Sequence, residues 1–319
     1  MGRPLLDRLG RGRPTVSGPA YSAPVKIGVT LPMSRSDGPG RMPAWPDVCA
    51  LARHAESAGL DSVWICDHFL SEPPERPPEG VLEAWTILSA LAVATRRVTV
   101  GTLVTCGSFR HPALLAKMAT TVDGISRGRL VLGVGAGFPG LEYEAYGFPN
   151  DHRLARLEET LEIVGGLLRG AAVTTPGRFH ELRNASLLPP PDRRIPLLVA
   201  GGGPRLLRLV ARHADAWNTA WHGAPDGRLR AQLAVMAQAL ADEGRDVGSL
   251  RVTVGVSVTD PDHSDVIEDD GAFAGSLDDL ARVIDEYALL GVDELIVALA
   301  PRTERSVDRL VRALTVRSS

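Results

Sequence analysis

A carboxylate and an imidazole stand next to each other at Asp67 and His68, where an apolar, β-branched run over residues 61–67 ends. Imidazole titrates near neutral pH, and a carboxylate beside it can orient the ring. The pair therefore suits proton transfer, with His68 as the proton-carrying group and Asp67 as its orienting partner. The competing interpretation is structural: an aspartate that caps a loop and a histidine that fills a gap. Their position at the end of a predicted strand favours catalysis.

Three consecutive glycines, Gly201, Gly202 and Gly203, separate a predicted strand from a predicted helix that begins at Arg205. Glycines in front of a helix expose backbone N–H groups, and the helix dipole favours an anion at that position. The sequence therefore predicts a phosphate-binding turn at these glycines. A flexible turn without a ligand is the alternative.

A second glycine-rich segment, residues 133–137, ends the fourth predicted strand. Its spacing resembles the dinucleotide fingerprint, which requires a helix directly behind the glycines. Here Pro139 and Gly140 follow, and no helix is predicted to start there. We therefore expect no Rossmann-type site, but a close approach of a ligand ring to the backbone at Gly137 and Phe138.

The end of the third predicted strand, Leu103, Val104, Thr105 and Cys106, includes small hydroxyl and thiol side chains. Such side chains leave room for a flat molecule against the backbone. An ordinary transition from strand to loop explains them equally well.

Three aromatic or imidazole side chains are candidate substrate contacts. Tyr143 lies in the aromatic segment after the fourth predicted strand, and Trp221 and His222 follow the sixth. Trp217, within the sixth strand, is as consistent with core packing as with stacking on a ligand.

These residues must be held by a repeating arrangement, because strand-like and helix-like segments alternate from residue 25 to the end of the chain. Eight strands, each followed by a helix, are the number that closes a (β/α)₈ TIM barrel, although an open doubly wound sheet is the alternative. A hairpin-like segment over residues 173–191 is an insertion between strands 4 and 5. The predicted strands cover residues 25–31, 61–67, 98–105, 129–135, 196–200, 215–219, 250–258 and 294–299.

Composition excludes several classes of function. The 319 residues carry a net charge of −3 without a basic stripe, which disfavours nucleic acid as a partner. No apolar run approaches the roughly 20 residues of a membrane span. Histidines at metal-ligand spacing are absent from the sequence, and we expect neither a metal site nor a serine nucleophile.

The chain is expected to comprise a flexible, Arg-, Gly- and Pro-rich extension over residues 1–24 and one barrel domain over residues 25–319. Its three cysteines, Cys49, Cys66 and Cys106, cannot all pair and lie in apolar surroundings. Reduced thiols and a cytoplasmic location are therefore expected.

Several segments together resemble the bacterial-luciferase-like monooxygenase superfamily. The likeness covers nearly the whole chain from residue 25, and the order and spacing of the motifs make it specific. It implies a TIM barrel and a homodimer. The segments that carry it are residues 25–29, 61–69, 110–113, 126–130, 133–137, 200–204 and 214–218.

Within the superfamily, residues 67–69 and 200–204 are more similar to the branch that uses the deazaflavin coenzyme F420 than to the branch that uses FMN. The resemblance implies that His68 lies at the deazaflavin ring and assists hydride transfer. It also implies a non-proline cis peptide at Leu103 and Val104 behind the ring, and a phosphate at the three consecutive glycines.

One departure separates this chain from the sugar-phosphate dehydrogenases of that branch. They have a catalytic glutamate directly after the strand-four glycines, where this chain has Phe138, and they bind the sugar phosphate with lysines. Lys26 and Lys117 are the only lysines here. The sequence therefore predicts an F420-dependent oxidoreductase that transfers hydride between the deazaflavin and a small organic substrate other than a sugar phosphate.

Three alternatives remain open from the sequence. They are an FMN-dependent monooxygenase that uses reduced flavin and oxygen, a barrel that binds flavin without catalysis, and a phosphosugar isomerase or aldolase. The last would require a Schiff-base lysine or a metal at a strand end, and neither is evident in the sequence.

Overall fold

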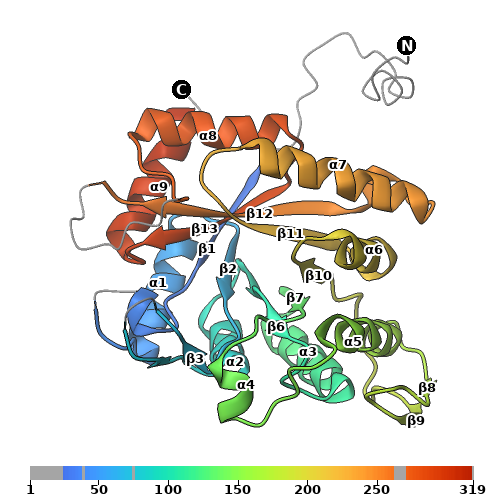
Figure 1. The fold of residues 1–319 in the computed structure, drawn as a ribbon. Helices are drawn as coiled ribbons and strands as arrows, with labels where there is room; N and C mark the ends of the chain where they lie inside the picture. The colour runs from blue at the N-terminus through green and yellow to red at the C-terminus, as the bar shows by residue number, and fades with distance from the viewer. Residues whose placement is uncertain (1–23, 38–39, 74–75, 262–270, 318–319) are drawn as a thin grey trace, which may run out of the picture.

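The alternating segments fold into a parallel barrel surrounded by helices (Figure 1). The computed structural model describes residues 24–37, 40–73, 76–261 and 271–317, so nearly all of the expected N-terminal extension lies outside the described residues. The barrel strands are β1 (Lys26–Thr30), β2 (Ser62–Ile65), β5 (Thr99–Thr102), β7 (Leu130–Gly135), β10 (Leu197–Ala200), β11 (Ala216–His222), β12 (Arg251–Thr259) and β13 (Glu294–Ala300).

Each barrel strand is followed by a helix that packs on the outside, as expected from the alternation. These helices are α1 (Trp45–Ser57), α2 (Ala84–Ala94), α3 (Pro112–Ser126), α5 (Arg153–Leu168), α6 (Pro204–His213), α7 (Gly227–Asp242), α8 (Leu277–Leu289) and α9 (Glu304–Arg317).

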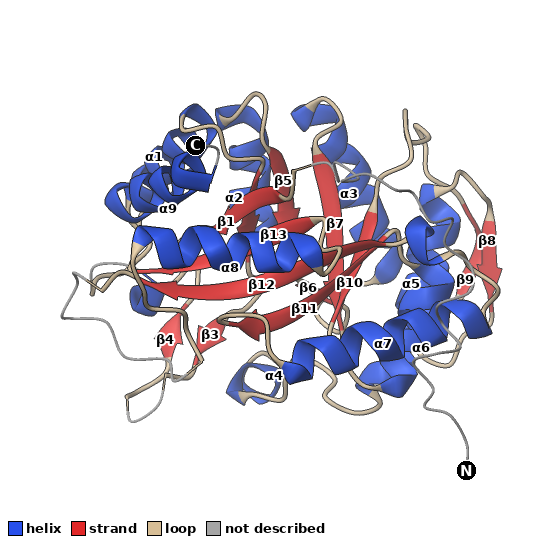
Figure 2. Cartoon of the chain, turned by 90° about the horizontal axis from the view of Figure 1, so that it is seen from above, coloured by secondary structure: helices blue, strands red, loops and turns tan. Residues whose placement is uncertain are grey.

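Parallel pairing continues around the whole sheet and closes it. Strand β1 pairs with β2 and β13, and the ring closes where β7 pairs with β10 through Leu132 and Leu197. This closure excludes the open doubly wound sheet and confirms the predicted (β/α)₈ barrel. The predicted insertion is also confirmed: the hairpin of β8 (Val173–Thr175) and β9 (Leu182–Ala185) lies beside α5 (Figures 1 and 2).

Three local predictions were wrong. A short helix, α4 (Leu141–Ala145), forms soon after the β7 glycines, where no helix was predicted. Strand β11 continues to His222, so Trp221 and His222 belong to the strand and not to the loop; the absence of a side chain at Gly255 leaves space for the Trp221 ring. The proline-rich loop after β2 contains an unpredicted hairpin of β3 (Leu70–Ser71) and β4 (Glu79–Gly80).

Three barrel strands are preceded by an aspartate that fixes the register of the neighbouring strand. Asp61 accepts the Ile27 N–H at 2.8 Å, Asp293 accepts the Val252 N–H at 2.7 Å, and Asp215 acts in the same way on β10. A carboxylate that accepts a backbone N–H satisfies a donor that would otherwise remain unpaired at the strand end. At the N-terminal end of the barrel, these carboxylates therefore stabilise the fold.

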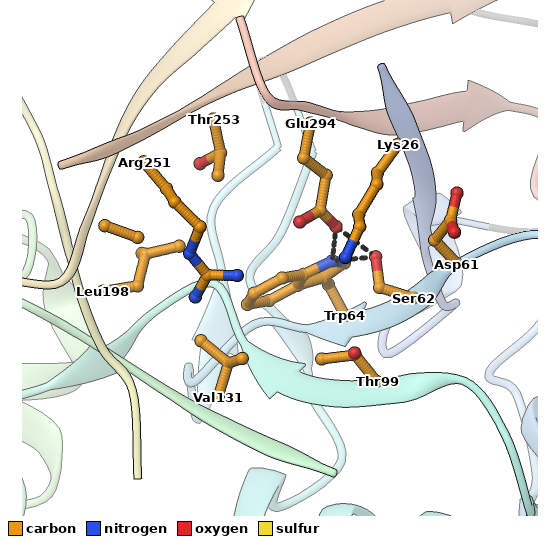
Figure 3. A pocket seen from close by; sticks show the side chains of 11 residues that line it. Lys26, Asp61, Ser62, Trp64, Thr99, Val131, Leu198, Arg251, Thr253 and Glu294 are labelled. Carbon is orange, nitrogen blue, oxygen red and sulfur yellow. Dashed lines mark hydrogen bonds between the residues drawn. The ribbon is translucent and has the colours of Figure 1, made fainter. Parts of the chain in front are cut away.

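Trp64 fills the lower barrel interior, where its Nε1–H donates to Ser62 Oγ at 2.7 Å (Figure 3). Glu294, the first residue of β13, also bonds to Ser62 and lies at 3.4 Å from Trp64 Nε1. The cavity around Trp64 is only about 30 Å³, and a second one of about 230 Å³ lies at the same end beside Lys26, Arg251 and Glu294. The Trp64 ring and its hydrogen bonds consequently fill the barrel interior at the N-terminal ends of the strands.

Burial raises the pKa of Glu294, although hydrogen bonds from Ser62 and Trp64 oppose the shift. A raised pKa means that the folded state favours the protonated carboxyl, so its stabilisation is complete at low pH and is lost as the pH rises through the folded-state pKa. We expect Glu294→Gln to match the parent at about pH 4, below the ordinary glutamate pKa, and to melt at a higher temperature at about pH 8.

Thermal unfolding across that range tests this expectation, with Glu286→Gln on the exposed side of α8 as a control. An equal difference at both ends of the pH range would contradict it.

Candidate functional site

The candidate active site lies at the C-terminal end of the barrel strands, where the β3–β4 hairpin and α4 lie side by side (Figure 1). A cavity of about 330 Å³ opens there beside His68, which follows β2. Side chains from four segments line it, and they include Ser34, Asp37, Cys66, His68, Leu70, Glu72, Phe138 and Glu142. Active sites of (β/α)₈ barrels occupy this end.

His68 is held by Glu142, and not by Asp67 as the sequence predicted. His68 Nδ1 lies 2.9 Å from Glu142 Oε1, while Glu142 Oε2 accepts the backbone N–H groups of Phe69 at 2.8 Å and Leu70 at 3.3 Å. An ionised carboxylate only accepts, so Nδ1 carries the hydrogen. Nε2 is then the ring nitrogen available to a molecule in the cavity.

The electrostatics of the pair favour the protonated imidazole and the ionised carboxylate. The hydrogen bond to Glu142 raises the pKa of His68, although burial opposes the shift. Burial raises the pKa of Glu142, but the bonds from His68 and from the backbone at Phe69 outweigh it, and the net pKa is lowered. His68 therefore keeps its second proton to a higher pH than an ordinary histidine.

Asp67 has a different role from the predicted one. Its buried carboxylate accepts two hydrogen bonds from Arg110, at 2.6 and 3.0 Å, and the backbone N–H of Cys106 at 3.0 Å. Arg110 also donates to Glu83 at 2.6 Å. Consecutive side chains of an extended segment point in opposite directions, so Asp67 turns away from His68. It anchors the loop after β5 instead.

The strand-three end has the geometry that the resemblance implied, because the Leu103–Val104 peptide is cis. Val104 packs over the β7 glycines: a Cβ atom at Gly135 would lie 2.6 Å from Val104 Cγ2, and one at Gly133 would overlap Thr102 O. Those glycines therefore make room for the protein's own loop. The expected approach of a ligand to the backbone is not needed to explain them.

Two residues predicted to contact a ligand in this region, Thr105 and Cys106, point into the protein interior. Thr105 Oγ1 donates to Thr102 Oγ1 at 3.0 Å in the interior, and Cys106 Sγ lies 3.1 Å from the hydroxyl of Tyr143. Tyr143 is only 1% exposed and packs against Phe109, so it is part of the interior packing behind the site and does not line the cavity. Gly137 has a positive φ of 72°, and its backbone passes close over the contact between Cys106 and Tyr143.

The other predicted substrate residues differ in exposure. Phe138 is 78% exposed and lines the cavity, and Trp221 is 41% exposed at the end of β11. His222 is buried, and its Nδ1 lies 3.0 Å from Arg228 Nη2. Trp217 is a core residue whose Nε1–H donates to Gly201 O at 2.8 Å.

The predicted phosphate turn leads directly into α6. Gly201 and Gly203 have positive φ angles of 129° and 90°, and Gly203 caps the helix without a side-chain bond. The Gly201 N–H donates to Asn218 O at 3.0 Å. Within the described residues, the N–H groups of Gly202 and Gly203 have no protein acceptor. Gln232, which no sequence pattern indicated, borders the turn from α7.

The site fits a flavin-type cofactor. Thr30 ends β1 and alternates with the outward Val29, so it faces the barrel interior. Its buried hydroxyl finds no hydrogen-bond partner in the described part of the chain. This polar atom, the cis segment and the exposed N–H groups of the glycine turn offer contacts to a molecule with a polar ring and a phosphate.

Other site types find no support in the described ranges. They contain no group of three histidine, cysteine or carboxylate side chains arranged to hold a metal ion. No helix among them is long and apolar enough to cross a membrane.

Several curated relatives of this chain carry the name of an F420-dependent enzyme. The protein of Amycolatopsis mediterranei named F420-dependent glucose-6-phosphate dehydrogenase is 36% identical over 177 residues, 54% of this chain and 52% of the relative. The protein of that name from Kineococcus radiotolerans is 30% identical and covers 78% of this chain and 72% of its own length. The chain thus spans between about half and three quarters of the length of these relatives.

A solved structure shares the fold at low sequence identity. An F420-dependent secondary alcohol dehydrogenase, solved in complex with an F420–acetone adduct, superposes with a TM-score of 0.79 at 21% identity, covering 92% of this chain and 99% of that one. Residues 25–294 match the family of luciferase-like monooxygenases. The chain belongs to the luciferase-like monooxygenase family, as its motifs indicated.

Proposed function

We propose that this chain is an F420-dependent oxidoreductase that exchanges hydride with a small organic substrate. The observation that carries the proposal is the His68–Glu142 pair beside a cavity at the C-terminal end of the barrel, in which the hydrogen bond to Glu142 raises the pKa of the imidazole. The names of the curated relatives support the choice of coenzyme.

Different residues of the chain would hold the ring, bind the phosphate and transfer the proton. Leu103 and Val104 support a flat ring from behind, and the N–H groups of Gly202 and Gly203 bind the phosphate at the α6 N-terminus. The deazaflavin, when bound, supplies or accepts the hydride. His68 Nε2 gives a proton to the substrate oxygen during reduction, or takes it during oxidation, and Glu142 holds the ring in orientation.

A binding titration of the purified protein with F420 and FMN side by side tests this proposal. We expect tight, saturable binding of F420 and weaker binding of FMN. Preferential binding of FMN would favour the rival proposal, a monooxygenase that uses reduced flavin and oxygen, which the family also supports. Binding without hydride exchange would favour a non-catalytic flavin-binding barrel.

Gly202→Val is expected to weaken F420 binding at least about tenfold, because its branched side chain obstructs the N–H groups that receive the phosphate. The fold should persist, since the nearest obstacle is the flexible end of Gln232, 3.2 Å from the added Cβ. Fluorescence titration measures the affinity. Gly227→Val, in open space at the start of α7, is the matched control. Parent-like affinity in Gly202→Val would place the phosphate elsewhere.

We further propose a cytoplasmic homodimer. Its support is the family resemblance together with three free cysteines, Cys49, Cys66 and Cys106. Light scattering on the eluted protein tests the assembly.

A further inference from the structure

The walls of the cavity beside His68 are acidic. Asp37, Glu72 and Glu142 line it, and no lysine or arginine does so among the residues that the structure describes. The adjoining stretches 38–39 and 74–75, outside that set, contain no lysine or arginine in the sequence. Among the described lining residues, His68 is the side chain that can carry a positive charge, and it is already paired with Glu142.

Two of the three carboxylates are engaged by the protein. Asp37 pairs with Arg302 and accepts the backbone N–H groups of Met33 and Ser34, each at 2.9 Å. Glu142 holds His68 and two backbone N–H groups. Their charges are therefore compensated within the fold, and neither is free to select a ligand.

Glu72 differs from them. It follows the β3 strand, is exposed, and accepts the backbone N–H of Leu141 at the start of α4 through Oε1. In the described part of the chain, no cation forms an ion pair with it. One oxygen thus anchors α4, and the other is available to a molecule that enters the cavity.

We propose, on the basis of the proposed function, that the substrate is uncharged or cationic and presents a hydroxyl or ammonium donor to Glu72. An anionic group at that position would meet the Glu72 carboxylate, which no ion pair within the described residues compensates, and the repulsion between like charges a few ångströms apart opposes binding. The chain therefore selects against phosphorylated sugars, unlike the relatives named glucose-6-phosphate dehydrogenase. Glu72 is the residue that determines this specificity.

Three probes that share one sugar ring separate charge from shape: glucosamine, glucose and glucose 6-phosphate. Their binding to the F420-loaded protein is measured by calorimetry. We expect glucosamine to bind at least about tenfold more tightly than glucose 6-phosphate, with glucose between them, and the difference to shrink at high salt. Glu72→Gln retains an acceptor for the Leu141 N–H and should reduce the difference several-fold.

Glu144→Gln, on the exposed side of α4, is the matched control and should leave the order of affinities unchanged. Glucose 6-phosphate binding as tightly as glucosamine, an unchanged order in Glu72→Gln, or no binding of glucosamine and glucose would each overturn the proposal. Failure of the proposed function is distinguished by the preceding F420 titration. If F420 does not bind, the same series on the unloaded protein tests the selectivity of the cavity by itself.

Discussion

His68→Ala is expected to slow hydride transfer by about 10²-fold or more, the usual size of a general acid–base contribution. The expected loss follows from the geometry, because Nε2 is the ring nitrogen available to the cavity while Nδ1 is bonded to Glu142. F420 binding should change much less, since the glycine turn and the cis segment remain. Single-turnover hydride transfer on the folded, F420-loaded variant gives the rate.

The same rate should depend on pH in a defined direction. Glu142 raises the pKa of His68, so the parent retains the imidazolium, and with it fast substrate reduction, until the pH rises through that raised value. Glu142→Gln removes the negative charge, which should lower the pKa of His68 and move the loss of activity to lower pH.

Glu144→Gln lies two residues away on the same short helix and serves as the control. If His68→Ala retains the parental rate, His68 has no part in the mechanism. If the pH profile of Glu142→Gln equals that of the parent, Glu142 does not set the pKa of His68, while the role of His68 itself is unaffected.

The barrel was predictable because its determinants are local. Each strand is a short apolar run, and helices α1 and α3 both have a proline in their first turn. Strand β11 was underestimated because its extension depends on the space above Gly255, which belongs to a distant segment. Closure itself required the β7–β10 pairing, which no single segment reveals.

The candidate site was predictable at the strand ends and not beyond them. His68 and the glycine turn follow strands directly, so position alone indicated them. Glu142 was not assigned to His68, because it is 74 residues away and its helix lies in a loop that no periodicity marks. Tyr143 was assigned to substrate from its aromatic type, but burial places it under the site.

Asp67 illustrates how adjacency in sequence misleads, because its partner is Arg110 and not the neighbouring His68. The carboxylate of Asp67 is 1% exposed and the guanidinium of Arg110 is 9% exposed, so this ion pair is removed from solvent. Removing one member of a buried pair leaves an uncompensated charge, which typically costs about 3–5 kcal/mol.

Arg110→Ala should therefore lower the free energy of unfolding by about 3–5 kcal/mol. Asp67→Asn should cost less, because its amide oxygen still accepts the Cys106 N–H while Arg110 keeps Glu83. Denaturant unfolding measures both variants, and Arg183→Ala, at an exposed ion pair, should change stability by less than about 1 kcal/mol.

The catalytic and the positioning interpretation of Asp67 predict different activities for those Asp67→Asn molecules that are folded. A positioning role predicts that folded, F420-loaded Asp67→Asn keeps the parental maximal rate of hydride transfer, because His68 retains its bond to Glu142. Loss of the Asp67 charge should move the pH profile less than Glu142→Gln does, because Glu142 is the larger cause of the raised pKa of His68. A proton-handling role predicts the reverse, a rate reduced by about 10²-fold with stability nearly intact. The second result would restore Asp67 as the partner of His68 and contradict the geometry, in which the carboxylate of Asp67 is engaged by Arg110 and the backbone of Cys106.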